Sequence, residues 1–162
     1  MQTTAQFDLV VKMTLNAWDA QIGYLNKLLD EFTDEQLLNE ISPGRNSGIY
    51  LLGHLVAVSD AMLPLLGFGN RLFPVLEEVF IKMPDKAGQV MPSITELKEN
   101  LKVVNAKLKE HFTATSPAQW LEKHNSVSAE DFAKEPHRNK LNIIISRTNH
   151  MANHIGQMLM LK

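Results

Sequence analysis

Hydrophobic residues recur along this chain at alternating steps of three and four, which is the spacing of one face of an α-helix. Four stretches show this spacing, and their positions are Val11, Leu15, Trp18, Ile22, Leu25 and Leu29; Leu51, Leu55, Val58, Met62 and Leu65; Ile94, Leu97, Leu101, Val104 and Leu108; and Leu141, Ile144, Thr148, Met151, Ile155 and Met158, where Thr148 is the one polar member. No stretch shows sustained strand alternation, and the run 143–145 is too short to outweigh its helical flanks. Each helix has one apolar stripe to cover, so we predict an all-α, up-down four-helix bundle that forms a single domain over residues 1–162.

Capping residues agree with these four helices. The predicted N-caps of the second, third and fourth helices are Ser47, Ser93 and Asn139. The pair Ser93–Glu96 has the form of a capping box, and so do Thr33–Gln36 and Ser116–Gln119. Because the last two pairs fall between the long helices, we expect short extra helices in the connections.

Composition and charge exclude several classes of partner. The chain has 162 residues, 44% of them hydrophobic, with 16 Lys and Arg against 18 Asp and Glu. This near-neutral balance provides no excess of positive charge for binding nucleic acid or an anionic membrane. The first residues lack a basic and apolar leader, so we expect a cytoplasmic protein. The most apolar stretch, 50–69, contains His54, Ser59 and Asp60, so we predict a buried helix there and no membrane span.

Two histidines in the fourth predicted helix are candidates for metal binding. The chain has no cysteine, so a transition-metal site must use imidazole and carboxylate ligands. His150 and His154 lie four residues apart, about 6 Å along the helix axis, so both rings can face one ion. Arg147 and Gln157 extend them into a polar stripe beside the apolar one. The same spacing also fits two half-exposed surface histidines, and the pattern leaves both interpretations open.

His54 is the third candidate. It lies between Leu51 and Val58 in the second predicted helix, so we expect its ring to be at least partly buried. A lone histidine in such a place is more often a core residue whose ring nitrogens are hydrogen-bonded than a metal ligand. Convergence with two further histidines would change that interpretation, because buried neutral imidazoles that lie close together need an ion or hydrogen bonds.

The remaining candidates have other interpretations. His111 continues the apolar seam of the third predicted helix near its C-terminus, where the helix dipole favours a protonated ring, so we interpret it as a boundary residue. His124 and His137 fall in connecting segments and belong to no cluster of ligand residues. Gln157, three residues after His154, is a candidate for orienting a bound cofactor or substrate, with a surface amide or a dimer contact as the alternatives.

Three runs of residues resemble a known family. They are Leu-Leu-Asp-Glu-Phe-Thr-Asp-Glu-Gln-Leu at 28–37, Gly-Arg-Asn-Ser-Gly-Ile-Tyr-Leu-Leu-Gly-His-Leu at 44–55, and Asn-His-Met-Ala-Asn-His-Ile-Gly-Gln at 149–157. The first two runs are similar to the end of the first helix and the entry into the second helix of DinB/YfiT-like proteins. The third is similar to the C-terminal signature of that family, in which two histidines separated by three residues precede x-Gly-Gln.

The resemblance implies a four-helix bundle of the DinB/YfiT-like type, commonly a homodimer. It also implies one divalent metal, nickel or zinc, bound by His54, His150 and His154. Many members of the family carry a further histidine directly before the last one, where this chain has Asn153. That position is not one of the three ligands, so we expect the departure to affect the surroundings of the metal and not its binding.

A metal held by three imidazoles keeps open coordination positions, as catalytic sites do. If a low-molecular-weight thiol fills one, the reaction is S-transfer to a small-molecule electrophile; relatives use bacillithiol, mycothiol or glutathione. If water fills it, hydrolysis follows, and a binding module without turnover is the third alternative. We favour the thiol on the family resemblance. The residues agree with it, because no carboxylate lies at ligand-adjacent spacing in either histidine helix and Asp60, six residues after His54, points in another direction.

Overall fold

The computed structural model describes residues 2–162, and the burial of side chains from residue 5 onward. Its elements are α1 (Gln2–Glu31), α2 (Asp34–Leu38), α3 (Gly48–Asp60), α4 (Met62–Leu66), α5 (Val75–Glu77), the π-helix η1 (Glu78–Lys82), α6 (Ile94–Ala114), α7 (Pro117–Trp120), α8 (Ala129–Lys134), α9 (Lys140–Met158) and the 3₁₀-helix η2 (Leu159–Leu161). Residues 2–162 contain no strand beyond two isolated bridges. The prediction of an all-α protein with short helices in its connections is confirmed.

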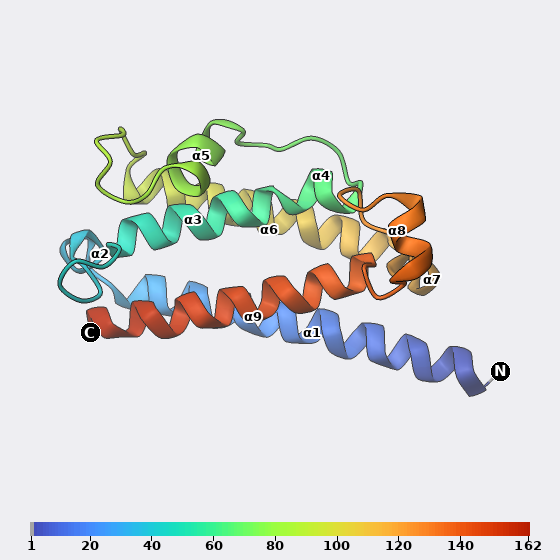
Figure 1. Ribbon diagram of the computed structural model, residues 1–162. Coiled ribbons are helices and arrows are strands. Elements are labelled where there is room, and N and C mark those ends of the chain that lie inside the picture. The colour runs from blue at the N-terminus through green and yellow to red at the C-terminus, as the bar shows by residue number, and fades with distance from the viewer. Residues whose placement is uncertain (1) are drawn as a thin grey trace.

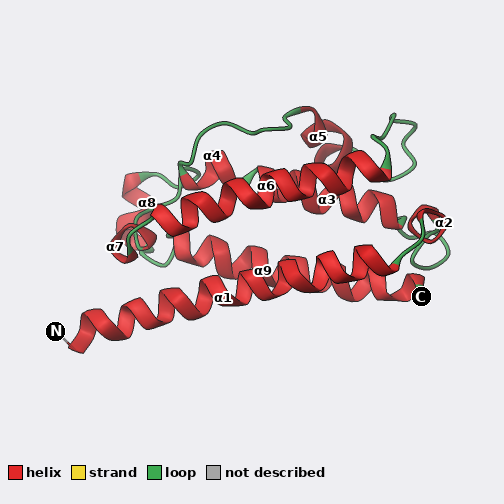
Figure 2. Cartoon of the chain, turned by 180° about the vertical axis from the view of Figure 1, so that it is seen from behind, coloured by secondary structure: helices red, strands yellow, loops and turns green. Residues whose placement is uncertain are grey.

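The four long helices pack lengthwise in two pairs, α1 with α9 and α3 with α6 (Figures 1 and 2). α1 and α9 run in the same direction, and at their ends Lys162 Nζ donates to the Glu31 carboxylate at 2.7 Å. α6 begins beside the end of α1, where Lys98 Nζ donates to the Leu29 carbonyl. α3 likewise begins beside the end of α9, because Gly48 lies against the Leu161 side chain. The helices therefore run up, down, down, up, which corrects the simple up-down order that the sequence predicted.

A long connection makes this order possible. Residues 67–93 leave α4 at one end of the molecule and return to the other end before α6 begins (Figure 1). Gly67 ends α4 with φ of 79°, a left-handed conformation that glycine adopts without strain. The fully buried Asp60 holds the connection, because its two carboxylate oxygens accept from Leu72 N–H at 2.7 Å and Phe73 N–H at 3.0 Å. A short loop would have forced α6 to run antiparallel to α3.

The predicted caps determine where the helices begin. The side chains of Ser47, Ser93 and Asn139 each accept the backbone N–H three residues further on. The boxes at Thr33–Gln36 and Ser116–Gln119 form with bonds back to the cap backbone, whereas at Ser93 only the bond accepted by the serine forms. The second predicted helix is interrupted at Ala61, which separates α3 from α4.

The most apolar stretch is a core element. Residues Gly48–Leu66 are long and apolar enough to cross a membrane, with a mean hydropathy of 1.7, but 78% of that window is buried inside the protein. Leu51, Leu52, Leu55 and Val56 are all fully buried or nearly so. The stretch is therefore surrounded by the other helices, as the interruptions in its sequence predicted.

Candidate metal centre

Three histidines meet between α3 and α9. His54 comes from α3, and His150 and His154 come from successive turns of α9. The Nε2 atom of His150 lies 3.2 Å from Nε2 of His54 and 3.2 Å from Nε2 of His154. Potential ligand atoms of all three residues lie within 4.8 Å of one another, and each ring is half-buried. The three residues that the sequence singled out are thus brought together.

The spacing of the ring nitrogens fits a metal ion. Two nitrogen ligands at about 2.0–2.1 Å from a tetrahedral zinc ion lie about 3.3 Å apart. Both short Nε2–Nε2 distances, at 3.2 Å, agree with that value. The donor set therefore could hold one divalent ion without a large rearrangement of α3 or α9.

The Nδ1 side of the His54 ring is hydrogen-bonded to the connection between α4 and α6. His54 Nδ1 lies 2.7 Å from the Phe80 carbonyl oxygen. Because a carbonyl oxygen only accepts, Nδ1 carries the proton and Nε2 keeps the lone pair that a metal requires. Gly53 makes room for this arrangement, since a Cβ at that position would overlap the buried Phe80 ring.

A π-helical turn presents the Phe80 carbonyl to His54. Phe80 is the middle residue of η1, and π-helical turns often occur at functional sites. Tyr50, one turn before His54 on α3, fixes the end of this turn, because its hydroxyl donates to the Met83 carbonyl at 2.7 Å. Sequence reasoning missed Phe80, since a backbone carbonyl leaves no signature in the identity of its residue.

The back of the His154 ring is held from within α9. His154 Nδ1 lies 3.0 Å from Gln157 Oε1, and Gln157 Nε2 donates to Asn153 Oδ1 at 3.5 Å. Gln157 was one candidate for orienting a cofactor or substrate, and in this structure its amide oxygen contacts His154. Its effect on any bound group would therefore act through His154.

The surroundings keep the α9 histidines neutral. Desolvation by burial, then the neighbouring His154, His54 and Arg147, lower the pKa of His150 from 6.5 to about 4. Burial also lowers the pKa of His154, an effect that the hydrogen bond to Gln157 opposes. Both rings are thus predominantly uncharged at neutral pH, and the neutral imidazole is the form that binds metal.

The other histidines lie outside this centre. His111 is in the last turn of α6, as predicted, and its ring stacks on Phe68 with 4.7 Å between the ring centroids. His124, which the sequence analysis assigned to no cluster, is buried, and its Nδ1 accepts the Ser126 N–H at 3.2 Å. His124 thus has a structural role, in a turn that the sequence pattern did not reveal.

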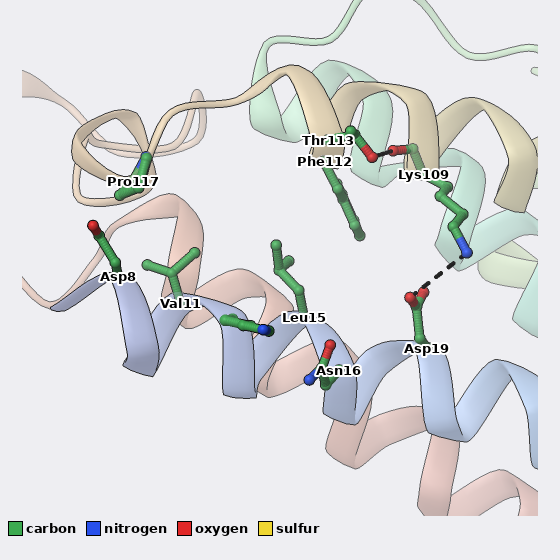
Figure 3. A pocket seen from close by; sticks show the side chains of 10 residues that line it. Asp8, Val11, Leu15, Asn16, Asp19, Lys109, Phe112, Thr113 and Pro117 are labelled. Atoms are coloured by element: carbon green, nitrogen blue, oxygen red, sulfur yellow. Dashed lines mark hydrogen bonds and ion pairs between the residues drawn. The ribbon is translucent and has the colours of Figure 1, made fainter. Parts of the chain in front are cut away.

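A separate hollow of about 370 Å³ lies between α1 and α6 (Figure 3). Leu15 and Phe112 point toward it from the two helices, and the exposed pair Lys109–Asp19 spans one end at 3.8 Å. None of the three converging histidines lines this hollow. It is therefore distinct from the candidate metal centre.

Comparison with known proteins finds a family model that matches most of the chain. The family model described as the DinB superfamily matches residues 17–158. These residues include both histidine-bearing helices. No curated protein is significantly similar to the chain.

Proposed function

This chain belongs to the DinB superfamily, and we propose that it is a metal-dependent thiol S-transferase. In this proposal His54, His150 and His154 bind one divalent ion, nickel or zinc, and the second reactant is a low-molecular-weight thiol. The observation that carries the proposal is the convergence of three histidine rings, in which Nε2 of His150 lies 3.2 Å from Nε2 of both His54 and His154.

The donor set supports both parts of the proposal. Neutral imidazoles suit nickel and zinc, and three protein ligands leave coordination positions open to a reactant. A metal bound there would supply the Lewis acidity that deprotonates a thiol or a water molecule at neutral pH. The chain's own part is to hold the rings: the Phe80 carbonyl and the Gln157 amide keep a lone pair on Nε2 of His54 and His154.

The position of the nearest carboxylate on these helices favours a thiol over water as the reactant. α9 contains no acidic residue, and the one acidic residue of α3 is Asp60. Both Asp60 oxygens accept backbone N–H groups of the connection, so this carboxylate is not free to act as a general base. A thiol needs no such base once its proton is lost, because the thiolate is itself a strong nucleophile.

The proposed reaction is a substitution at an electrophilic carbon. The S–H proton passes to solvent, sulfur forms a new S–C bond, and the leaving group departs with the electrons of the bond that breaks. The thiol is the co-reactant, and bacillithiol, mycothiol and glutathione are its candidate forms. The electrophile is a small molecule that approaches the half-buried rings from solvent.

Activity assays separate this proposal from its alternatives. Protein loaded with Ni²⁺ or Zn²⁺ is incubated with each thiol and 1-chloro-2,4-dinitrobenzene, and separately with 4-nitrophenyl acetate and no thiol. We expect conjugation above the uncatalysed rate, and its loss in His154→Ala but not in His111→Ala. Ester hydrolysis without conjugation would favour a hydrolase, and neither activity in metal-loaded protein would favour a binding module; each result would contradict the transferase.

A further inference from the structure

Three side chains of α9 form a hydrogen-bonded chain that ends at the metal centre. Asn153, His154 and Gln157 are about one turn apart or less, and none of them belongs to the buried stripe of α9. Gln157 contacts His154 through its amide oxygen at 3.0 Å and Asn153 through its amide nitrogen at 3.5 Å. The two ends of one amide therefore have different partners.

The orientation of the Gln157 amide determines the tautomer of His154. With the amide oxygen toward the ring, Nδ1 must donate, and Nε2 keeps its lone pair on the side of His54 and His150. With the amide turned over, its NH₂ group would donate to Nδ1, and the ring proton would move to Nε2. A protonated Nε2 cannot bind a metal, so the second orientation would remove one ligand from the site.

We propose that Gln157 and Asn153 are positioning residues that select the metal-binding tautomer of His154. The Asn153 oxygen accepts from the Gln157 NH₂ group and thereby favours the orientation in which the amide oxygen faces the ring. This inference rests on the proposed function for its purpose, since the tautomer matters only where Nε2 is a ligand. It also gives a role to Asn153, whose side chain does not reach the three rings itself.

His150 is the ring that must change its tautomer when a metal binds. With lone pairs on Nε2 of His54 and His154, the single His150 Nε2–H proton is shared between both short contacts at 3.2 Å in the metal-free protein, as a bifurcated hydrogen bond. No partner for His150 Nδ1 is found within residues 5–162, so that nitrogen is free to take the proton. Metal binding thus requires a change of tautomer at His150 alone, because His54 and His154 already have a lone pair on Nε2.

Nitrogen NMR of ¹⁵N-histidine-labelled, metal-free protein at pH 7.5 tests the proposal. We expect the wild-type His154 and His54 to be Nδ1–H tautomers and His150 to be the Nε2–H tautomer. Gln157→Met removes the acceptor and should give His154 mixed tautomers, with metal affinity lower by about 10- to 100-fold. Gln157→Glu keeps an acceptor and should restore the Nδ1–H tautomer.

Variants at Asn153 test the second link of the chain. Asn153→Asp keeps an oxygen that accepts from Gln157 and should behave as wild type, whereas Asn153→Leu should shift His154 toward mixed tautomers. Asn149→Leu, an equally exposed asparagine of α9, is the matched control and should change neither readout. A single Nδ1–H tautomer with wild-type metal affinity in Gln157→Met would overturn the proposal. If the tautomers shift as stated but the wild type binds neither Ni²⁺ nor Zn²⁺, the proposed function fails and the positioning role stands.

Discussion

At the scale of single residues, the metal centre depends on the groups that hydrogen-bond to the histidine rings as much as on the histidines themselves. His54, His150 and His154 could be singled out from spacing, from position on the helices and from the family resemblance. The acceptor behind His54 could not, because the Phe80 carbonyl belongs to a residue far along the chain and any residue type has one. The contact of Gln157 with His154 could have been predicted from the sequence, since residues three apart on a helix are neighbours.

Gly53→Ala tests the packing behind His54. The added methyl group would overlap the buried Phe80 ring, so η1 must shift and the Phe80 carbonyl must move away from His54. We expect the free energy of unfolding to fall by about 1–3 kcal/mol and metal affinity to fall with it, as measured by urea denaturation and metal titration. Gly23→Ala, where the new methyl group meets no neighbour, should instead stabilise α1 by up to about 1 kcal/mol. Equal effects of the two substitutions would contradict the packing described here.

His124 makes the stability depend on pH. Burial, then the neighbouring Arg138 and Lys123, lower its pKa below 6.5 in the folded protein. Between the folded pKa and 6.5 the unfolded state binds more protons, so the free energy of unfolding decreases as the pH falls through this window. His124→Asn should flatten this part of the profile in urea denaturation at pH 5 to 8. An unchanged slope in the variant would show that His124 does not contribute.

At the scale of elements, the hydrophobic pattern predicted the four long helices and their caps, but the up-down order predicted with them was wrong. The spacing of an apolar stripe is the same in both directions along a helix, so it does not tell whether α6 runs parallel or antiparallel to α3. The direction is set by the connection 67–93, whose path depends on one buried carboxylate and on the turn at Gly67. The π-helical turn was equally hidden, since η1 is too short to show any period.

Asp60→Asn tests how the connection is held. An asparagine can accept with one atom only, so the N–H of either Leu72 or Phe73 loses its partner in a part-buried place. We expect a loss of about 1–3 kcal/mol in the free energy of unfolding, with faster amide exchange at residues 72 and 73. The exposed Asp30→Asn, on α1, serves as the control and should change stability by less than about 0.5 kcal/mol. Unaltered exchange in the Asp60 variant would argue that the connection is anchored elsewhere.

At the scale of the whole molecule, α1 has a second apolar stripe that faces away from the core. Val10, Met13 and Tyr24 lie on it at helical spacing and are all more than half exposed. Exposed Ile145 of α9 and Leu159 of η2 lie beside it, and hollows of about 280 Å³ flank Met13 and Tyr24. An apolar surface on two adjacent helices is typical of a protein interface.

We expect this α1–α9 face to form the homodimer that the sequence resemblance implied. Because a twofold contact pairs one surface with itself, Met13→Asp places two charges in the interface and should dissociate the dimer. Sedimentation velocity over a concentration series measures this change. Val75→Asp, on an exposed residue of the connection, should leave the association intact. A wild-type protein that stays monomeric throughout the series would rule out the dimer.

The most direct test of the central claim is the metal content of purified protein. The wild type, His54→Ala, His150→Ala, His154→Ala and His111→Ala are each loaded with Ni²⁺ or Zn²⁺, dialysed, and analysed by mass spectrometry of the elements. We predict about one ion per chain in the wild type and in His111→Ala, and loss of stoichiometric metal in the other three variants. Full metal content in any of those three variants, or none in the wild type, would contradict a centre built from these histidines.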